Sequence, residues 1–161
     1  MKIRLGVVLL SLAVMLGCSH TARLYPVQGP LSAQTPVPVL LAKITGALTP
    51  ADISVVMGDG EVCKGHWELV RRPKPGKGEN TATAPETNGM PAIWDTIYGQ
   101  GFYLSHVLGA RLYAKAVVNG ERGTVLNVEM YKPEGEHEGN PVAAIKGVAK
   151  DNKDNVYKLT F

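Results

Sequence analysis

The sequence contains little of the chemistry that marks most metal proteins and thiol enzymes. Its 161 residues include two cysteines, Cys18 and Cys63, and four histidines. No C-x-x-C, H-x-x-x-H or H-E-x-x-H spacing occurs, which excludes the common zinc-site and thiol-redox motifs. We therefore expect no bound metal and no cofactor.

The chain also lacks a large excess of basic over acidic residues. The formal net charge is +3, from 17 basic and 14 acidic residues. Lys2 and Arg4 lie in an N-terminal segment without acids, so the rest of the chain is close to neutral. Nucleic-acid-binding proteins normally carry a clustered basic stripe, so we expect no nucleic-acid partner. The one dense basic cluster, residues 71–77, lies in a Pro- and Gly-rich stretch. We interpret it as a solvated loop, with contact to anionic headgroups as the alternative.

No hydrophobic run is long enough to cross a bilayer as a helix. The longest, residues 5–16, follows Lys2 and Arg4 and is almost entirely apolar. As a helix it would measure roughly 18 Å, against a hydrocarbon core of ~30 Å. A short basic start followed by such a run is typical of a secretory leader, so we predict a cleaved signal peptide over residues 1–17.

The end of the leader carries the most specific motif in the chain. Met15-Leu16-Gly17-Cys18 resembles the bacterial lipobox, in which a small residue precedes an invariant cysteine. The resemblance implies cleavage between Gly17 and Cys18 and a thioether-linked diacylglyceryl group on the Cys18 thiol. Several acyl chains anchor stably, because each buried methylene contributes ~0.8 kcal/mol. An ordinary signal peptide that ends by chance at a cysteine is the alternative.

Two consequences follow from that resemblance. Residue 19 is Ser rather than Asp. In this it resembles the Gram-negative lipoproteins that are sent on to the outer membrane. We therefore expect a domain anchored by lipid in the outer membrane and facing the periplasm. With Cys18 acylated, Cys63 has no partner within the chain. We interpret Cys63 as a small buried core residue, with an intermolecular disulfide or a reactive thiol as the alternative.

The remainder of the chain has the pattern of many short strands. Glycine (18) and proline (11) are frequent, and apolar residues alternate with polar ones between turn sequences such as Gly58-Asp59-Gly60 and Asn119-Gly120. About seven or eight strands predict an all-β domain, either an antiparallel barrel or a sandwich. The strand candidates are 21–25 as a first edge strand, then 43–47, 52–57, 61–70, 112–118, 126–130, 142–149 and 157–161.

The alternation also predicts which side chains face the core. The expected inward set is Ile53, Val55, Met57, Cys63, Gly65, Trp67, Leu69, Leu112, Ala114, Ala116, Val118, Leu126, Val128, Met130, Tyr157, Leu159 and Phe161. The expected solvent-facing set is Lys64, His66, Glu68, Asn127 and Glu129.

We divide the exported part into two regions. Residues 18–38 are the lipidated cysteine and a proline-rich tether, and residues 39–161 are a single β-rich domain. Residues 73–91 show no periodicity, so we expect a long flexible loop there, with a functional loop as the alternative. Residues 92–109 have helical spacing interrupted by Gly99 and Gly101, and fit a short helix or an irregular aromatic segment equally well.

Candidate catalytic groups do not converge in the sequence. His20 lies in the expected tether, His66 on a wet face, and His137 in an acidic loop. Ser105 adjoins His106, but adjacent residues on a strand face opposite sides. We therefore assign no catalytic residue. Asp95, next to Trp94 and Tyr98, is the one acid set among aromatic residues, and would be the first candidate for a glycan-binding or hydrolytic site.

A second resemblance covers turns across much of the chain. Residues 21–25, 58–65 and 120–124 resemble segments of small bacterial lipoproteins of unknown function. Members of that group often carry further cysteines in the late strands. Asn127 and residues 146–150 supply none, so we do not expect their disulfide here.

Three functions remain open on these observations. The first is a lipid-anchored, non-enzymatic module that binds an envelope protein or glycan, or supports envelope structure. The second is a periplasmic hydrolase or glycan-active enzyme that uses Asp95. The third, by analogy of architecture alone, is an inhibitor of a hydrolase.

Overall fold

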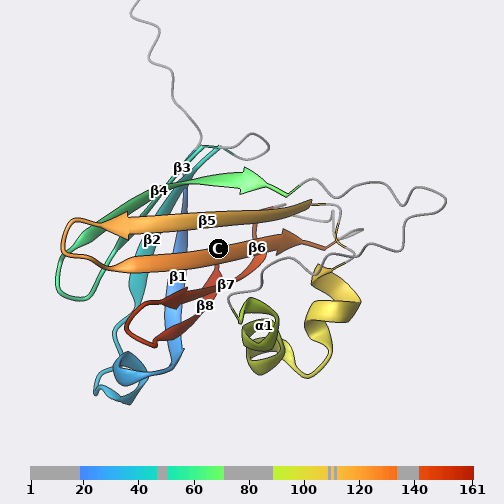
Figure 1. Cartoon of the computed structure of the whole chain (residues 1–161). Helices are drawn as coiled ribbons and strands as arrows, with labels where there is room; N and C mark the ends of the chain where they lie inside the picture. Colours follow the sequence, from blue (N-terminus) through green and yellow to red (C-terminus); the bar gives the residue numbers. More distant parts are fainter. Residues whose placement is uncertain (1–18, 47–50, 71–88, 109, 111, 134–141) are drawn as a thin grey trace, which may run out of the picture.

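Eight antiparallel strands close into a barrel in a computed structural model that describes residues 19–46, 51–70, 89–108, 110, 112–133 and 142–161 (Figure 1). Each strand pairs with the next along the chain, and β8 pairs with β1. The all-β expectation is confirmed, and the β1–β8 pairing makes the fold a barrel rather than a sandwich. The strands are β1 (Ser19–Gln28), β2 (Leu40–Thr45), β3 (Asp52–Val56), β4 (Val62–Leu69), β5 (Leu112–Gly120), β6 (Val125–Lys132), β7 (Lys146–Asp151) and β8 (Val156–Thr160).

The up-and-down order gives the barrel two different ends. At the N-terminal end β1 begins and β2 ends, and Ser19 pairs with Thr45. At the opposite end, which we call the hairpin end, short turns over residues 57–61, 121–124 and 152–155 join successive strands. The fourth connection at the hairpin end joins β1 to β2 and contains a 3-10 turn, η1 (Pro30–Ala33).

Inward-facing side chains fill the barrel. The expected inward residues of β3 and β4, such as Ile53, Val55 and Cys63, are at most 1 % exposed. Lys64, His66 and Glu68 alternate with them and are exposed, as predicted. Trp67 packs inside near the N-terminal end, and its indole N–H donates to the carbonyl of Thr45 at 2.9 Å. Eight strands enclose a space that side chains alone can fill.

Two inward-facing glycines allow the barrel to curve tightly. A Cβ at Gly65 would collide with the carbonyl oxygen of Val117, and one at Gly147 would lie 3.0 Å from the carbonyl oxygen of Glu129. Without a side chain, the backbones of neighbouring strands approach closely at these positions. Glycine at such points is typical of strongly bent strands.

A second, smaller core lies outside the barrel. The helix α1 (Met90–Tyr98) and a π-helical turn, η2 (Tyr103–Val107), cover outward-facing residues of β5 to β8 (Figure 1). Pro91 in the first turn and Gly99 after the last residue, with φ of 111°, bound the helix. The ambiguous segment is therefore helical. Tyr113, Tyr131 and Val148 are buried beneath it although they face away from the barrel interior.

The expected tether over residues 18–38 is wrong, because Ser19–Gln28 is a barrel strand. β1 pairs with β2 on one side and β8 on the other, so it is not an edge strand. Pro26 does not interrupt the strand, since the register shifts between Pro26 and Gln28, and a bulge is where a proline without an N–H is tolerated. The barrel therefore begins 20 residues earlier than the boundary we predicted at residue 39.

Two further expectations are corrected. The strand predicted over 142–149 begins only at Lys146, because the N–H of Ile145 donates back to the carbonyl of Val142 in a turn. Glu129, expected in solvent, is buried under α1. Of the predicted flexible loop, residues 73–88 lie outside the described residues. The predicted loop ends too late, because Gly89 is the N-cap of α1 and Met90 and Pro91 begin the helix.

Candidate functional site

The predicted lipidation site lies directly before the barrel. Gly17 and Cys18 are outside the described residues, and the next residue, Ser19, is the first of β1. Ser19 pairs with Thr45, and His20 pairs with Ile44. A lipid on Cys18 would thus be joined to the N-terminal end of the barrel without an intervening tether.

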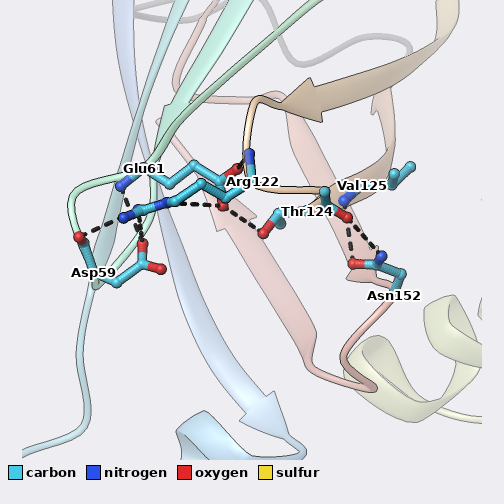
Figure 2. A network of polar contacts seen from close by, with 7 residues as sticks. Asp59, Glu61, Arg122, Thr124, Val125 and Asn152 are labelled. Carbon is cyan, nitrogen blue, oxygen red and sulfur yellow. Dashed lines mark hydrogen bonds and ion pairs between the residues drawn. The ribbon is translucent and has the colours of Figure 1, made fainter.

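A buried carboxylate at the hairpin end joins two turns (Figure 2). Glu61 precedes β4, and its Oε1 accepts the backbone N–H of Arg122 at 2.6 Å. Its Oε2 accepts the hydroxyl of Thr124, also at 2.6 Å. The Thr124 hydrogen bond, followed by that of the Arg122 N–H, holds the pKa of Glu61 below its ordinary value of 4.5. Glu61 is therefore an ionised structural group.

The same network includes a second acid of the β3–β4 turn and reaches the β7–β8 turn (Figure 2). The Arg122 guanidinium lies 2.8 Å from Asp59 Oδ1, which also accepts the backbone N–H of Glu61 at 3.0 Å. That N–H, and then Arg122, lower the pKa of Asp59. On the other side, Asn152 accepts the N–H of Val125 at 3.1 Å and donates to the carbonyl of Gly123 at 2.9 Å. Three hairpins are thus linked by side chains.

A second buried carboxylate closes the β7–β8 turn. Asp151 Oδ1 accepts the backbone N–H groups of Lys153 and Asn155 at 2.9 and 2.8 Å. Its Oδ2 accepts the amide of Asn155 at 2.8 Å and the hydroxyl of Tyr157 at 2.7 Å. Asn155 in turn accepts the N–H of Leu31 in η1 at 2.8 Å. Asp151 therefore stabilises the fourth connection at this end as well as its own turn.

Aromatic rings form a ladder along α1 and η2. Trp94, Tyr98, Phe102 and His106 recur every four residues and stack in sequence, with ring centroids 5.4, 4.8 and 4.5 Å apart. Tyr131 of β6 packs edge-on against Trp94 at 5.6 Å. Since the two middle rings each stack against two neighbours, the ladder leaves little free ring face for a sugar. The contacts of Trp94 and Phe102 with Tyr131 hold the helical segment against the barrel.

Asp95, the candidate acid among these aromatics, has a structural partner. Its Oδ1 accepts the backbone N–H of Tyr103, the first residue of η2, at 2.9 Å. Glu129 is the deeper acid, and its Oε2 accepts the indole N–H of Trp94 at 2.8 Å while Lys115 lies 3.4 Å from Oε1. Both carboxylates therefore hold the helical segment in place.

The histidines in the described part of the chain do not gather into a site. His66 Nδ1 lies 2.8 Å from Asp52 Oδ1, and both side chains are strongly exposed. His106 stacks on Phe102, while the Ser105 hydroxyl donates to the carbonyl of Gly101 at 2.9 Å within a helical turn rather than a strand. His137 lies outside the described residues. Within the described part of the chain, no group of three His, Cys, Asp or Glu side chains is placed to hold a metal ion.

Cys63 is a core residue, as interpreted from the sequence. Its side chain is fully buried in the barrel, and this burial raises the pKa of the thiol. A Cβ on Gly120 would lie 2.8 Å from its sulfur. An inaccessible, protonated thiol is unreactive, which disfavours the alternative of a redox-active cysteine.

The remaining candidate for function is a face rather than a cleft. Large apolar side chains are exposed on the outer surface of β1–β4 and of the half of β5 toward the hairpin end, which α1 and η2 leave uncovered among the described residues. Exposed apolar patches of this kind mark sites of association with another surface. The strand residues in this set are Tyr25, Val27, Leu41, Val56, Val62 and Val117.

Comparison with known proteins adds no relative. The chain matches no family model, no curated protein and no solved structure. Within the described residues, no helix combines the length and apolar character needed to cross a bilayer.

Proposed function

We propose that this chain is a lipid-anchored protein of the bacterial envelope that acts as a binding or structural module and not as an enzyme. The observation that carries the proposal is the position of the lipobox cysteine. Cys18 stands immediately before the first strand of a closed barrel, so acyl chains on its thiol would tether a rigid domain at the membrane surface. By the residue at position 19, the membrane is the outer one and the domain faces the periplasm.

The contacts of the buried carboxylates support a non-catalytic role. Glu61, Asp151 and Glu129 are buried, and each accepts hydrogen bonds from groups that hold turns or α1 in place. Asp95 is engaged with the backbone of Tyr103. A general acid or base must instead reach a substrate proton, at ~3 Å in a productive complex.

The anchor is tested on the full chain, expressed in a Gram-negative host. The mature protein should begin at Cys18, and its mass should exceed that of the polypeptide by a diacylglyceryl group and an acyl chain. Cys18→Ser should give an unprocessed or soluble form. A correctly cleaved Cys18→Ser protein that stays in the membrane would contradict the proposal.

The destination is tested by one exposed residue. Ser19 is exposed at the start of β1, so Ser19→Asp should leave the barrel intact. It should shift the acylated protein from outer-membrane to inner-membrane fractions on a density gradient. Ser19→Thr is the matched control, and an unchanged distribution of the Asp variant would contradict outer-membrane sorting by this position.

A further inference from the structure

Two neighbouring rows of side chains cross the uncovered outer face of β1–β4. In the apolar row, Leu41 pairs with Val56 and Val56 pairs with Val62, on three successive strands. These three side chains are 43 to 51 % exposed. In the next row toward the N-terminal end, Lys43 and Lys64 both pair with Ser54. Adjacent strands lie ~4.8 Å apart, so the two lysines are separated by only about 10 Å.

Three cations border the apolar row. Arg23 of β1 pairs with Leu41. It therefore stands at the β1 end of the apolar row, one strand from Lys43. Arg23, Lys43 and Lys64 are all exposed, and none forms an ion pair with any residue in the described part of the chain. Two acids near these rows contact other residues, since Asp52 of β3 pairs with His66 and Asp59 of the β3–β4 turn pairs with Arg122.

An apolar strip bordered by unpaired cations matches an anionic lipid surface. Apolar side chains enter the boundary between headgroups and acyl chains, while lysines and arginines contact the headgroup phosphates. A second copy of this chain fits less well. A two-fold interface would place the same patch on both partners and bring the three cations of one copy against those of the other.

The position of the anchor favours the same partner. β1 carries Arg23 on this face, and its first residue follows Cys18 directly. A lipid on Cys18 without a tether would keep the start of this face close to the bilayer, since Arg23 lies only four residues, about 13 Å, along β1 from Ser19. The helix α1 lies on the other half of the barrel, over β5–β8 (Figure 1).

We propose that the outer face of β1–β4 rests on an anionic bilayer, with Leu41, Val56 and Val62 at the headgroup boundary and Arg23, Lys43 and Lys64 on lipid phosphates. This inference rests on the proposed acylation of Cys18. It gives the domain a fixed orientation, in which α1 and the aromatic ladder point away from the membrane.

The orientation is measured with a fluorophore on the acylated full-length mature protein, reconstituted in vesicles. Ser54→Cys places an NBD label between the two lysines, and Thr96→Cys places it on the exposed side of α1. Native Cys63 is buried and does not react. The vesicles are pure phosphatidylcholine or phosphatidylcholine mixed with phosphatidylglycerol, and the readout is the rate at which dithionite reduces the label.

On anionic vesicles the label at residue 54 should be reduced about tenfold more slowly than on neutral ones, because basic residues at an anionic surface hold this face against the headgroups. The label at residue 96 should be reduced equally fast on both. Lys43→Glu/Lys64→Glu should abolish the protection. Lys150→Glu/Lys153→Glu, with the same change of charge away from this face, should not. All variants must keep the melting transition of the parent in detergent.

The outcomes separate this inference from the proposed function. If the mature protein carries no lipid, the proposed function fails. If it is acylated and the residue-54 label is reduced equally fast on both vesicles, only the membrane-facing orientation is overturned. Protection that is independent of lipid charge and accompanied by a dimer mass would also overturn it, in favour of a second copy.

Discussion

Replacing Tyr157 with phenylalanine isolates one hydrogen bond at the hairpin end of the barrel. The Tyr157 hydroxyl donates to Asp151 Oδ2 at 2.7 Å, and both side chains are at most 2 % exposed. Burial, followed by the nearby Asp151 carboxylate, raises the pKa of Tyr157, so the phenol remains a donor at neutral pH. Tyr157→Phe removes the donor and leaves the ring packing intact.

The expected loss can be estimated from the geometry. A hydrogen bond to a charged acceptor contributes ~1.5–3 kcal/mol net. Because Asp151 Oδ2 keeps the amide of Asn155 at 2.8 Å, we expect the lower part of that range. For a domain of this size the melting temperature should fall by about 5 °C. Chemical unfolding followed by circular dichroism, on the acylated protein in detergent, measures the change in unfolding free energy.

Tyr98→Phe is the matched control. The Tyr98 hydroxyl is 3.3 Å from the carbonyl of Gly147 and lies in a half-buried position, where water can replace it. Its removal should cost less than ~0.5 kcal/mol. If Tyr157→Phe is no more destabilising than Tyr98→Phe, the Asp151 network does not stabilise the barrel as argued. A double-mutant cycle with Asp151→Asn then shows whether the two groups are coupled at all.

Other predictions address the remaining contacts. Gly120→Ala should destabilise more than Gly58→Ala in the same unfolding assay, because a Cβ at Gly120 collides with the Glu61 carboxylate, whereas nothing lies near one at Gly58. The pKa of Glu61 is lowered in the folded protein, so the Glu61 carboxylate stabilises the fold above its ordinary pKa of 4.5 and loses this effect as pH falls through the folded pKa. Glu61→Gln should therefore flatten the decline of melting temperature in acid. An unchanged slope would count against a stabilising role of the ionised carboxylate. Trp94→Phe should cost ~1–3 kcal/mol by leaving the buried Glu129 without its indole donor, and a cost near zero would argue against that hydrogen bond. Deletion of residues 157–161 should abolish cooperative melting, since it removes most of β8 and opens the barrel between β7 and β1; an unchanged transition would refute the closure.

Local pattern predicted most of the barrel strands and their faces. Ile53, Val55, Cys63 and Leu126 were expected inside from alternation alone, and all are at most 1 % exposed. This succeeds because side chains of a strand alternate between two faces whatever the strand pairs with. Turn chemistry, such as Asp59-Gly60, placed the reversals for the same local reason.

The buried acids could not be predicted in this way. Glu129 sits in an alternating position that reads as solvent-facing, and only the packing of α1 over β6 buries it. Glu61 and Asp151 follow or adjoin turns, where acids are ordinary, and their burial depends on partners such as Thr124, 63 residues away. The four-residue recurrence from Trp94 to His106 was the one available signal for the aromatic ladder, and the glycines at 99 and 101 obscured it.

The sequence by itself determined the strand pattern, the inward residues and the motif at Cys18, because each depends on neighbours within a few positions. Only the tertiary structure decided that β8 closes on β1, that residues 19–28 are barrel rather than tether, and that α1 covers one half of the outer surface. Strand closure depends on contacts between residues more than 100 positions apart, as between Arg23 and Thr160. Helix docking depends on shorter but still non-local contacts, such as that between Trp94 and Glu129, 35 positions apart. The same closure leaves Leu41, Val56 and Val62 exposed as one strip, which no local pattern could show.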